Sequence, residues 1–201
     1  IGAMYEAGVP IQYSYHREPL AIWDVQTKLA GLPLSVEPPS AALQFNWRML
    51  LSLKTRTGFL THGAGLSSTG TESLDRRLPL PEFYSIPDET IHALGETKRR
   101  GGRVIAVGTT TARAIESFIR TGVAEGITDL KLGERESARL VDGILTGVHE
   151  PGTSHFHLEC AFVARETARH AFESVEAARF VAHEFGDTVL FLKEAKGRGV
   201  A

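Results

Sequence analysis

Short apolar runs alternate with stretches of helical spacing along most of this chain. Residues 104–107 form an apolar run typical of a buried strand, and residues 112–118 continue with helical spacing. The same pattern predicts further strands at 58–61, 128–132, 141–148 and 187–192, and helices at 41–50, 87–100 and 154–180, the last one broken near residue 165. This alternation predicts a layered α/β domain with a mainly parallel or mixed sheet.

The first 40 residues depart from this pattern. Prolines interrupt them at Pro10, Pro19, Pro33, Pro38 and Pro39, and only residues 21–30 could form a helix of useful length. We therefore expect residues 1–40 to be an irregular connecting segment packed on the main domain, and residues 41–201 to form an α/β catalytic-type domain. Because residue 1 is isoleucine, we also expect further N-terminal sequence in the gene product.

Composition narrows the function classes. A chain of 201 residues can bury one good core. Its net charge of −2 indicates no general basic surface for nucleic acid, although it does not exclude local basic patches. The lone cysteine, Cys160, excludes a disulfide framework or a cysteine-based metal cage. No apolar run is long enough to span a membrane and no signal peptide is visible, so we expect a cytoplasmic protein without a membrane partner, for which a monomer is allowed.

The junction after the apolar run at 104–107 is a candidate anion site. A strand that turns directly into a helix presents unpaired N–H groups and the positive end of the helix dipole. Gly108 lets a ligand approach the backbone, Thr109 and Thr110 supply hydroxyls, and Arg113 can clamp an anion with its guanidinium. The alternative is a structural helix, capped by threonine, with Arg113 on its solvated face.

Other loops also carry polar chemistry. The loop after the first strand, with Gly63 and Gly65, has the flexibility and donors of an anion nest, or is a plain surface loop. His149 follows a strand, and Thr153 or Ser154 after it could cap the next helix. The histidine can act as acid, base or hydrogen-bond donor, or it can simply be exposed. Glu82 lies among prolines and aromatics, where desolvation can raise its pKa, or where it can pair with an arginine.

His155 and His157 raise the question of a metal site. A spacing of one residue suits ligands on a strand, whereas a helix is predicted to begin here. A zinc site would also need a third converging ligand, which the sequence does not place. We expect no metal and no cofactor.

Taken in order, the motifs resemble one family. PSAALQF, HGAGLSS and PEFYSIP are followed by VGTTTARAIES, GITDL, VDGILTGVHEPGTS and HEFGDTVLFL. Over about residues 8–192 this order is similar to the S-adenosylmethionine:tRNA ribosyltransferase-isomerases of queuosine biosynthesis, and the stretch 105–117 matches almost residue for residue. Such enzymes have an α/β catalytic domain with a small inserted β-barrel. The resemblance implies a diverged member that lacks the N-terminal part and the barrel.

The resemblance implies S-adenosylmethionine as a substrate and tRNA as a partner. The family transfers and isomerises the ribosyl group of S-adenosylmethionine onto a 7-aminomethyl-7-deazaguanine in tRNA, which gives epoxyqueuosine and releases adenine and methionine. For that chemistry the candidate catalytic residues are His149, Glu82 and Arg113. The candidate substrate-binding residues are Gly63, Gly65, Gly108, Thr109, Thr110, Asp129, Asp142 and Ser154. Among them, the anionic Asp129 and Asp142 would face the sulfonium.

Departures from the family pattern leave alternatives open. Leu80 and Gln44 stand where the family has histidines, and residues 133–136 replace its Tyr-Pro-Gly-Tyr loop. These changes fall on the pocket for the tRNA base. Two alternatives to the family reaction therefore stand: a paralogous transferase that uses the same donor on a different acceptor, and a catalytically inactive binding homologue.

Overall fold

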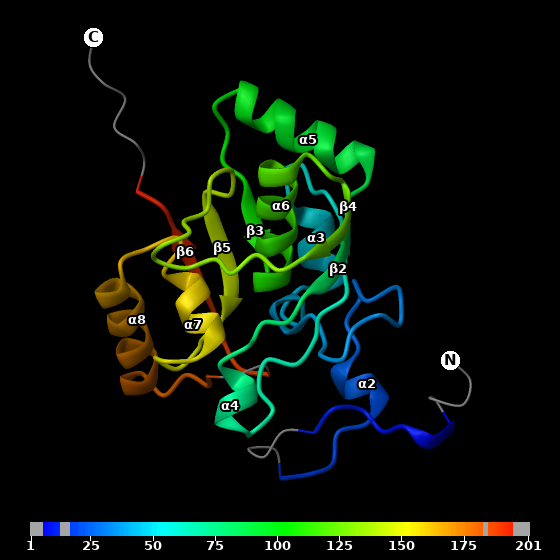
Figure 1. Ribbon diagram of the computed structural model, residues 1–201, viewed down its shortest axis with the longest axis vertical. Helices are drawn as coiled ribbons and strands as arrows, with labels where there is room; N and C mark the ends of the chain where they lie inside the picture. The colour runs from blue at the N-terminus through cyan, green and yellow to red at the C-terminus, as the bar shows by residue number, and fades with distance from the viewer. Residues whose placement is uncertain (1–5, 13–16, 183–184, 195–201) are drawn as a thin grey trace.

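The strands of this protein are divided between two small sheets. The computed structural model describes residues 6–12, 17–182 and 185–194 (Figure 1). One sheet has the order β3 (Ile105–Val107), β5 (Gly143–Gly147), β6 (Thr188–Leu192), with β3 parallel to β5 and β6 antiparallel to it. The other has the order β1 (Thr61–His62), β2 (Glu82–Ser85), β4 (Glu125–Thr128) and is antiparallel throughout. The α/β class and a mixed sheet are confirmed, and the described strands form two open sheets instead of a barrel.

Helix α6 (Thr109–Thr121) lies between the two sheets. Its Ala112 and Ile115 join a core built with Ala106 of β3 and Ile144 of β5. Its Ala114 belongs to a second cluster with Tyr84 of β2. As a result residues 112–117 are buried without interruption, polar ones included. A helix covered on several faces has little solvated surface, so its charged residues need partners inside the protein.

The other helices surround this centre. Helix α5 (Asp88–Arg99) has acidic residues in its first turn and basic residues in its last, which suits the helix dipole. Helices α7 (Ser154–Glu159) and α8 (Arg165–Ala177) lie beside β5 and β6, and α5 lies at the far end, above α6 (Figure 1). These helices fall within the predicted ranges, and the predicted break near residue 165 is confirmed.

Two predicted helices differ from the structure, and one short helix was not predicted. The helix expected over 41–50 is split into η1 (Ser40–Ala42) and α3 (Trp47–Ser52), because Asn46 starts a new helix by accepting a hydrogen bond from Met49 N (2.9 Å). The helix expected over 21–30 is limited to α2 (Ile22–Val25), and the short α4 (Glu72–Asp75) was not expected. The boundary proposed near residue 40 stays a prediction.

The strand expected at 128–132 is also wrong. The chain leaves the sheet at Thr128, where β4 ends and the Leu130 N–H donates to the Thr128 hydroxyl (3.1 Å). Leu132 is then buried in the main core from a loop. The apolar residues of this segment therefore reflect core packing, which periodicity alone cannot separate from a strand.

Candidate active site

A cavity of about 1460 Å³ opens at one edge of the mixed sheet. Because β3 and β5 are parallel, their carboxyl ends meet at this edge, followed by Gly108 and His149 respectively. The start of α6, the loop after β1 and the start of α7 complete the wall, together with parts of the N-terminal segment. The predicted site residues that line it are Gly65, Glu82, Gly108, Thr109, Thr110, Arg113, His149 and Ser154.

The first turn of α6 faces this cavity without a side-chain cap. Gly108 precedes the helix with φ +93° and donates its N–H to Leu145 O on β5 (2.8 Å). Among the residues that the structure describes, no side chain accepts from the first-turn N–H groups, and Thr109 and Thr110 line the cavity beside them. Uncapped N–H groups at the positive end of a helix favour a carboxylate or phosphate. The local geometry is therefore compatible with the predicted anion site at the start of α6.

Arg113 is not available as the expected anion clamp. Its side chain is 4 % exposed and forms an ion pair with Glu82, itself 8 % exposed. Its Nε also donates to Leu130 O (2.9 Å). Burial lowers the pKa of Arg113, and the adjacent Glu82 carboxylate opposes that shift. Two residues proposed as separate catalytic groups are thus partners in one buried pair, as the simpler interpretation of Glu82 expected.

The glycine-containing loop after β1 binds carboxylates of the protein itself. Gly65 N donates to Glu82 Oε1 (2.7 Å), and Ser67 donates to Glu37 Oε1 through its N–H (2.6 Å) and its hydroxyl (2.8 Å). Gly63 N is bonded to Phe83 O (2.8 Å), and Gly63 does not line the cavity. The loop is a nest, but its donors are occupied. Its role is to hold two buried carboxylates at the cavity wall, which makes this wall acidic.

Two features of this wall escaped sequence reasoning. Burial raises the pKa of Glu37, and no ion pair holds this carboxyl among the described residues. His62 is 3 % exposed, and neither of its ring nitrogens has a hydrogen-bond partner in the described structure. Its Nε2 lies 3.6 Å from Glu82 Oε2, too far for a hydrogen bond. Burial, aided by Arg113, lowers the pKa of His62 to about 4, so the ring is neutral at pH 7.

A second polar cluster forms the opposite part of the wall. His149 Nδ1 lies 2.7 Å from Glu159 Oε1, and the ring of His155 lies 4.6 Å from that of His149. Burial raises the pKa of Glu159 to about 8. Burial, then His149 and Arg113, lower the pKa of His155 to about 3. Thr153, rather than Ser154, caps α7 by accepting from Phe156 N (3.2 Å). His149 is therefore oriented by Glu159 and is not an exposed histidine.

The two aspartates proposed for the sulfonium are not in the cavity wall. Asp142 precedes β5, at the end of the strand opposite His149. There its Oδ2 accepts from Val104 N (2.7 Å) and Lys98 Nζ (2.6 Å), so it joins α5 to the mixed sheet. Asp129 lies outside the wall as well, although it raises the pKa of Arg113 by its charge. Asp142 was expected at the site because it lies in the same motif as His149. The two residues stand at opposite ends of β5, and only the carboxyl end of this strand faces the cavity.

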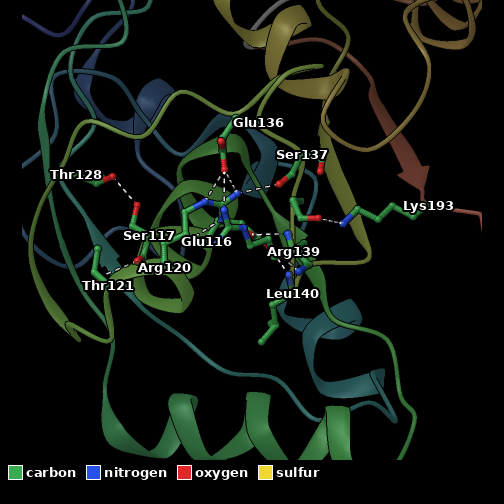
Figure 2. Close-up of polar contacts among 12 residues, drawn as sticks. Glu116, Ser117, Arg120, Thr121, Thr128, Glu136, Ser137, Arg139, Leu140 and Lys193 are labelled. Carbon is green, nitrogen blue, oxygen red and sulfur yellow. Dashed lines mark hydrogen bonds and ion pairs between the residues drawn. The ribbon is translucent and has the colours of Figure 1, made fainter. Parts of the chain in front are cut away.

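Glu116 supports the site from behind, on the face of α6 away from the cavity. It is fully buried, and its carboxylate accepts from Arg139 N (2.7 Å), Leu140 N (2.8 Å) and Val141 N (2.8 Å) (Figure 2). Arg120 bridges the same carboxylate to Glu136. These bonds fix the segment that enters β5, and so the strand that carries His149 at its other end. Nothing in the local sequence separates Glu116 from a solvated glutamate.

Metal ligands and membrane spans are not found in the described structure. No three His, Cys, Asp or Glu side chains gather in a group that could hold a metal ion within residues 6–12, 17–182 and 185–194. None of the helices in the same ranges is both long and apolar enough to cross a membrane.

Comparisons with known proteins agree with these features. The chain matches, over residues 3–191, a family described as "Queuosine biosynthesis protein". The S-adenosylmethionine:tRNA ribosyltransferase-isomerase of Rubrobacter xylanophilus is 32% identical over 198 residues, which are 95% of this chain and 58% of the relative. That of Thiobacillus denitrificans is 34% identical over 179 residues, covering 85% and 52%.

A solved structure adds the same relationship in three dimensions. The S-adenosylmethionine tRNA ribosyltransferase of Thermotoga maritima superposes with a TM-score of 0.63 at 30% identity, covering 76% of this chain and 51% of that one. The chain thus spans between half and three-fifths of the length of these relatives. With the matched segment running through nearly every element of the fold, the chain belongs to the queuosine biosynthesis protein family.

Proposed function

We propose that this protein transfers and isomerises the ribosyl group of S-adenosylmethionine onto 7-aminomethyl-7-deazaguanine in tRNA, which gives epoxyqueuosine and releases adenine and methionine. The observation that carries the proposal is the uncapped start of α6 in the same cavity as His149 and a pair of buried carboxylates. The relatives that the chain matches are named S-adenosylmethionine:tRNA ribosyltransferase-isomerases, which supports the proposal. S-adenosylmethionine acts as a substrate, and no cofactor is required.

The donor's charges match different parts of the wall. The carboxylate of its methionine part suits the N–H groups at Thr109 and Thr110, where the helix dipole is positive. The sulfonium is a cation and suits the acidic wall at Glu37, since that carboxyl has no ion pair among the described residues. Glu82 contributes less, because Arg113 neutralises it. The donor therefore spans the cavity from α6 to the loop after β1.

The cavity has room for a second reactant. Its volume of about 1460 Å³ exceeds the roughly 300–1,000 Å³ typical of a pocket for one small molecule. A base in tRNA reaches such a site by leaving its stack. His149 is the group placed to transfer a proton between the two reactants. A protein that modifies tRNA works in the cytoplasm, which is where we place this activity.

The test is adenine release. Purified protein is incubated with S-adenosylmethionine and tRNA that carries the aminomethyl deazaguanine, and adenine is followed by chromatography. Adenine that appears only with both reactants supports the proposal. His149→Ala should then lower turnover at least about 100-fold while calorimetric donor affinity changes little. Unchanged turnover would remove His149 from the mechanism.

A transferase with a different acceptor is the second candidate. The unpaired carboxyl of Glu37 in the cavity wall and the net charge of −2 are unfavourable for the phosphates of tRNA. Donor binding without adenine release in the presence of the tRNA, but with adenine release in the presence of a small amine acceptor, would favour this alternative. Donor binding without release on either acceptor would indicate a binding homologue.

A further inference from the structure

Glu159 is a buried acid that the proposed function has not yet used. Its side chain is 2 % exposed and lies at the end of α7, on the far side of His149 from the cavity. Helix α8 and strand β6 supply apolar groups around it. This lining consists of Val148, Ala168, Ala171, Phe172, Val175, Val189 and Phe191. An isolated carboxylate in such surroundings is strongly disfavoured unless it is neutral or hydrogen-bonded.

The hydrogen bond that Glu159 makes is directed at one nitrogen of His149. Its Oε1 lies 2.7 Å from Nδ1, while the same histidine ring lines the large cavity. The backbone of His149 follows the carboxyl end of β5, so the ring is fixed from two directions, by the strand and by α7. Because Nδ1 faces Glu159, a proton passed between this ring and a ligand in the cavity would travel through Nε2.

We propose that Glu159 is a positioning residue for His149: it holds the ring by Nδ1 and keeps a proton on Nε2 for delivery to the cavity. The proposal deepens the proposed function and rests on it only for the identity of the proton acceptor, which is the departing adenine. The pair resembles other acid–histidine arrangements in which a buried carboxyl fixes the tautomer of a reactive ring.

Proton counting explains how the pair works. When it holds two protons, Nε2 carries one of them, and the other lies between Nδ1 and Oε1. Donation from Nε2 to a nitrogen of the leaving base forms an N–H bond there and breaks the one on Nε2. The inner proton then stays on Nδ1, hydrogen-bonded to a carboxylate, and the pair changes from neutral to singly negative. No oxidant or further reactant is needed.

The surroundings keep the pair in its two-proton state at neutral pH. Burial raises the pKa of Glu159 to about 8. Within the described residues, α8 and β6 present only apolar side chains to this carboxyl. From α7 the titratable neighbours are His155, whose low pKa of about 3 leaves it uncharged, and Cys160, whose thiol is neutral because burial raises its pKa. The charge of Arg113, which is paired with Glu82, also lowers the pKa of His155.

The test compares Glu159→Val and Glu159→Gln with a matched control. Valine removes the acid but suits the apolar lining, so the fold should be kept. Glutamine keeps a hydrogen bond but cannot share a proton. Glu176→Gln makes the same change at an exposed position of α8 and is the control. The ¹⁵N resonances of the His149 ring are recorded from pH 6 to 9 for all four proteins.

We expect wild type and Glu176→Gln to show a protonated Nε2 at pH 7 and a hydrogen-bonded Nδ1. Glu159→Val should lose the Nδ1 signature and populate both tautomers, and Glu159→Gln should retain a hydrogen bond but lose the titration near pH 8. Ring resonances of Glu159→Val identical to those of wild type would overturn the proposal. This arm needs no substrate, so it decides the role of Glu159 even where adenine release is not observed.

Kinetics supply the second readout. Where wild type releases adenine, Glu159→Val should lower kcat about 100-fold with little change in KM, because misplacing a reacting group costs turnover more than binding. Glu159→Gln should recover part of that loss. A loss confined to KM, or equal rates for wild type and Glu159→Val, would contradict a role in positioning His149. Absence of adenine from wild type would instead refute the proposed function alone.

Discussion

Replacement of Glu116 by alanine should destabilise this protein strongly. The carboxylate is fully buried and binds the backbone N–H groups of three consecutive residues, 139–141 (Figure 2). Arg120 also binds it but keeps Glu136 and the Ser137 carbonyl as partners. The cost therefore comes mainly from three backbone donors left unpaired, the one at Val141 in a buried bond and the other two in partly buried bonds. At about 1 kcal/mol each, the lower end of the usual penalty, the loss is about 3 kcal/mol.

A loss of this size is large for one domain. Typical free energies of unfolding are about 5–15 kcal/mol. For a chain of this length each kcal/mol lowers Tm by roughly 2–4 °C, so Glu116→Ala should melt about 6–12 °C lower. Glu116→Gln should lose less, because its amide oxygen still accepts from Leu140 and Val141 while its amide nitrogen faces the Arg139 donor.

Urea unfolding followed by far-ultraviolet circular dichroism measures the difference, with Glu173→Ala as control. Glu173 pairs with Arg169 on the exposed side of α8 (3.0 Å), where removal of the pair should cost less than about 0.5 kcal/mol. Amide exchange should also accelerate first at residues 140 and 141. A Glu116→Ala protein within about 1 kcal/mol of wild type, or one with unchanged exchange there, would refute the reasoning.

Three further predictions concern the cavity wall. Glu82→Ala should cost about 3–5 kcal/mol in urea unfolding because Arg113 is left buried and unpaired, whereas the double variant Glu82→Leu/Arg113→Met should recover most of this loss; a double variant as unstable as the single one would contradict it. His62 and His155 have folded pKa values of about 4 and 3, below the ordinary 6.5, so their contribution to stability is intact above pH 6.5 and is lost as the pH falls towards 4. His62→Gln should therefore show a shallower loss of unfolding free energy in urea titrations from pH 7 to 4.5. A slope equal to that of wild type would refute this. Gly108→Ala should lower stability by about 1–2 kcal/mol through its φ of +93° and weaken calorimetric binding of S-adenosylmethionine, and a variant that binds and melts as wild type does would show that the start of α6 is not the donor site.

Local signals in the sequence were sufficient for the long helices and for the start of α6. Charged termini predicted α5, and the strand–glycine–threonine junction predicted a helix directly after the strand, although helical spacing was expected from residue 112 and α6 already begins at Thr109. These features depend on neighbours in sequence, such as caps, dipoles and side-chain period. They do not depend on what covers the element afterwards.

The polar partners of the site could not be predicted in the same way. Glu116 and Glu159 occupy helix positions that a period of 3.6 residues does not mark as buried polar sites, and they are buried because α6 lies between two sheets and α7 lies under α8. The Glu82–Arg113 pair joins residues 31 positions apart. Such contacts are set by the tertiary arrangement, so the sequence predicted the residue types at the site but not which of them bind each other.

The division of the strands between two sheets has a consequence for association. In a three-stranded sheet both outer strands are edges, so β1, β4, β3 and β6 each pair with one neighbour within the described structure. Exposed apolar side chains lie on three of these edges, at Ile105 of β3, Ile127 of β4, and Leu190 and Leu192 of β6. Unpaired edges of this kind are templates for strands of other molecules. These edge strands are only two to five residues long, and this shortness limits their pairing with strands of other molecules. A sheet with longer edge strands would need charged side chains or covering loops to prevent the same association.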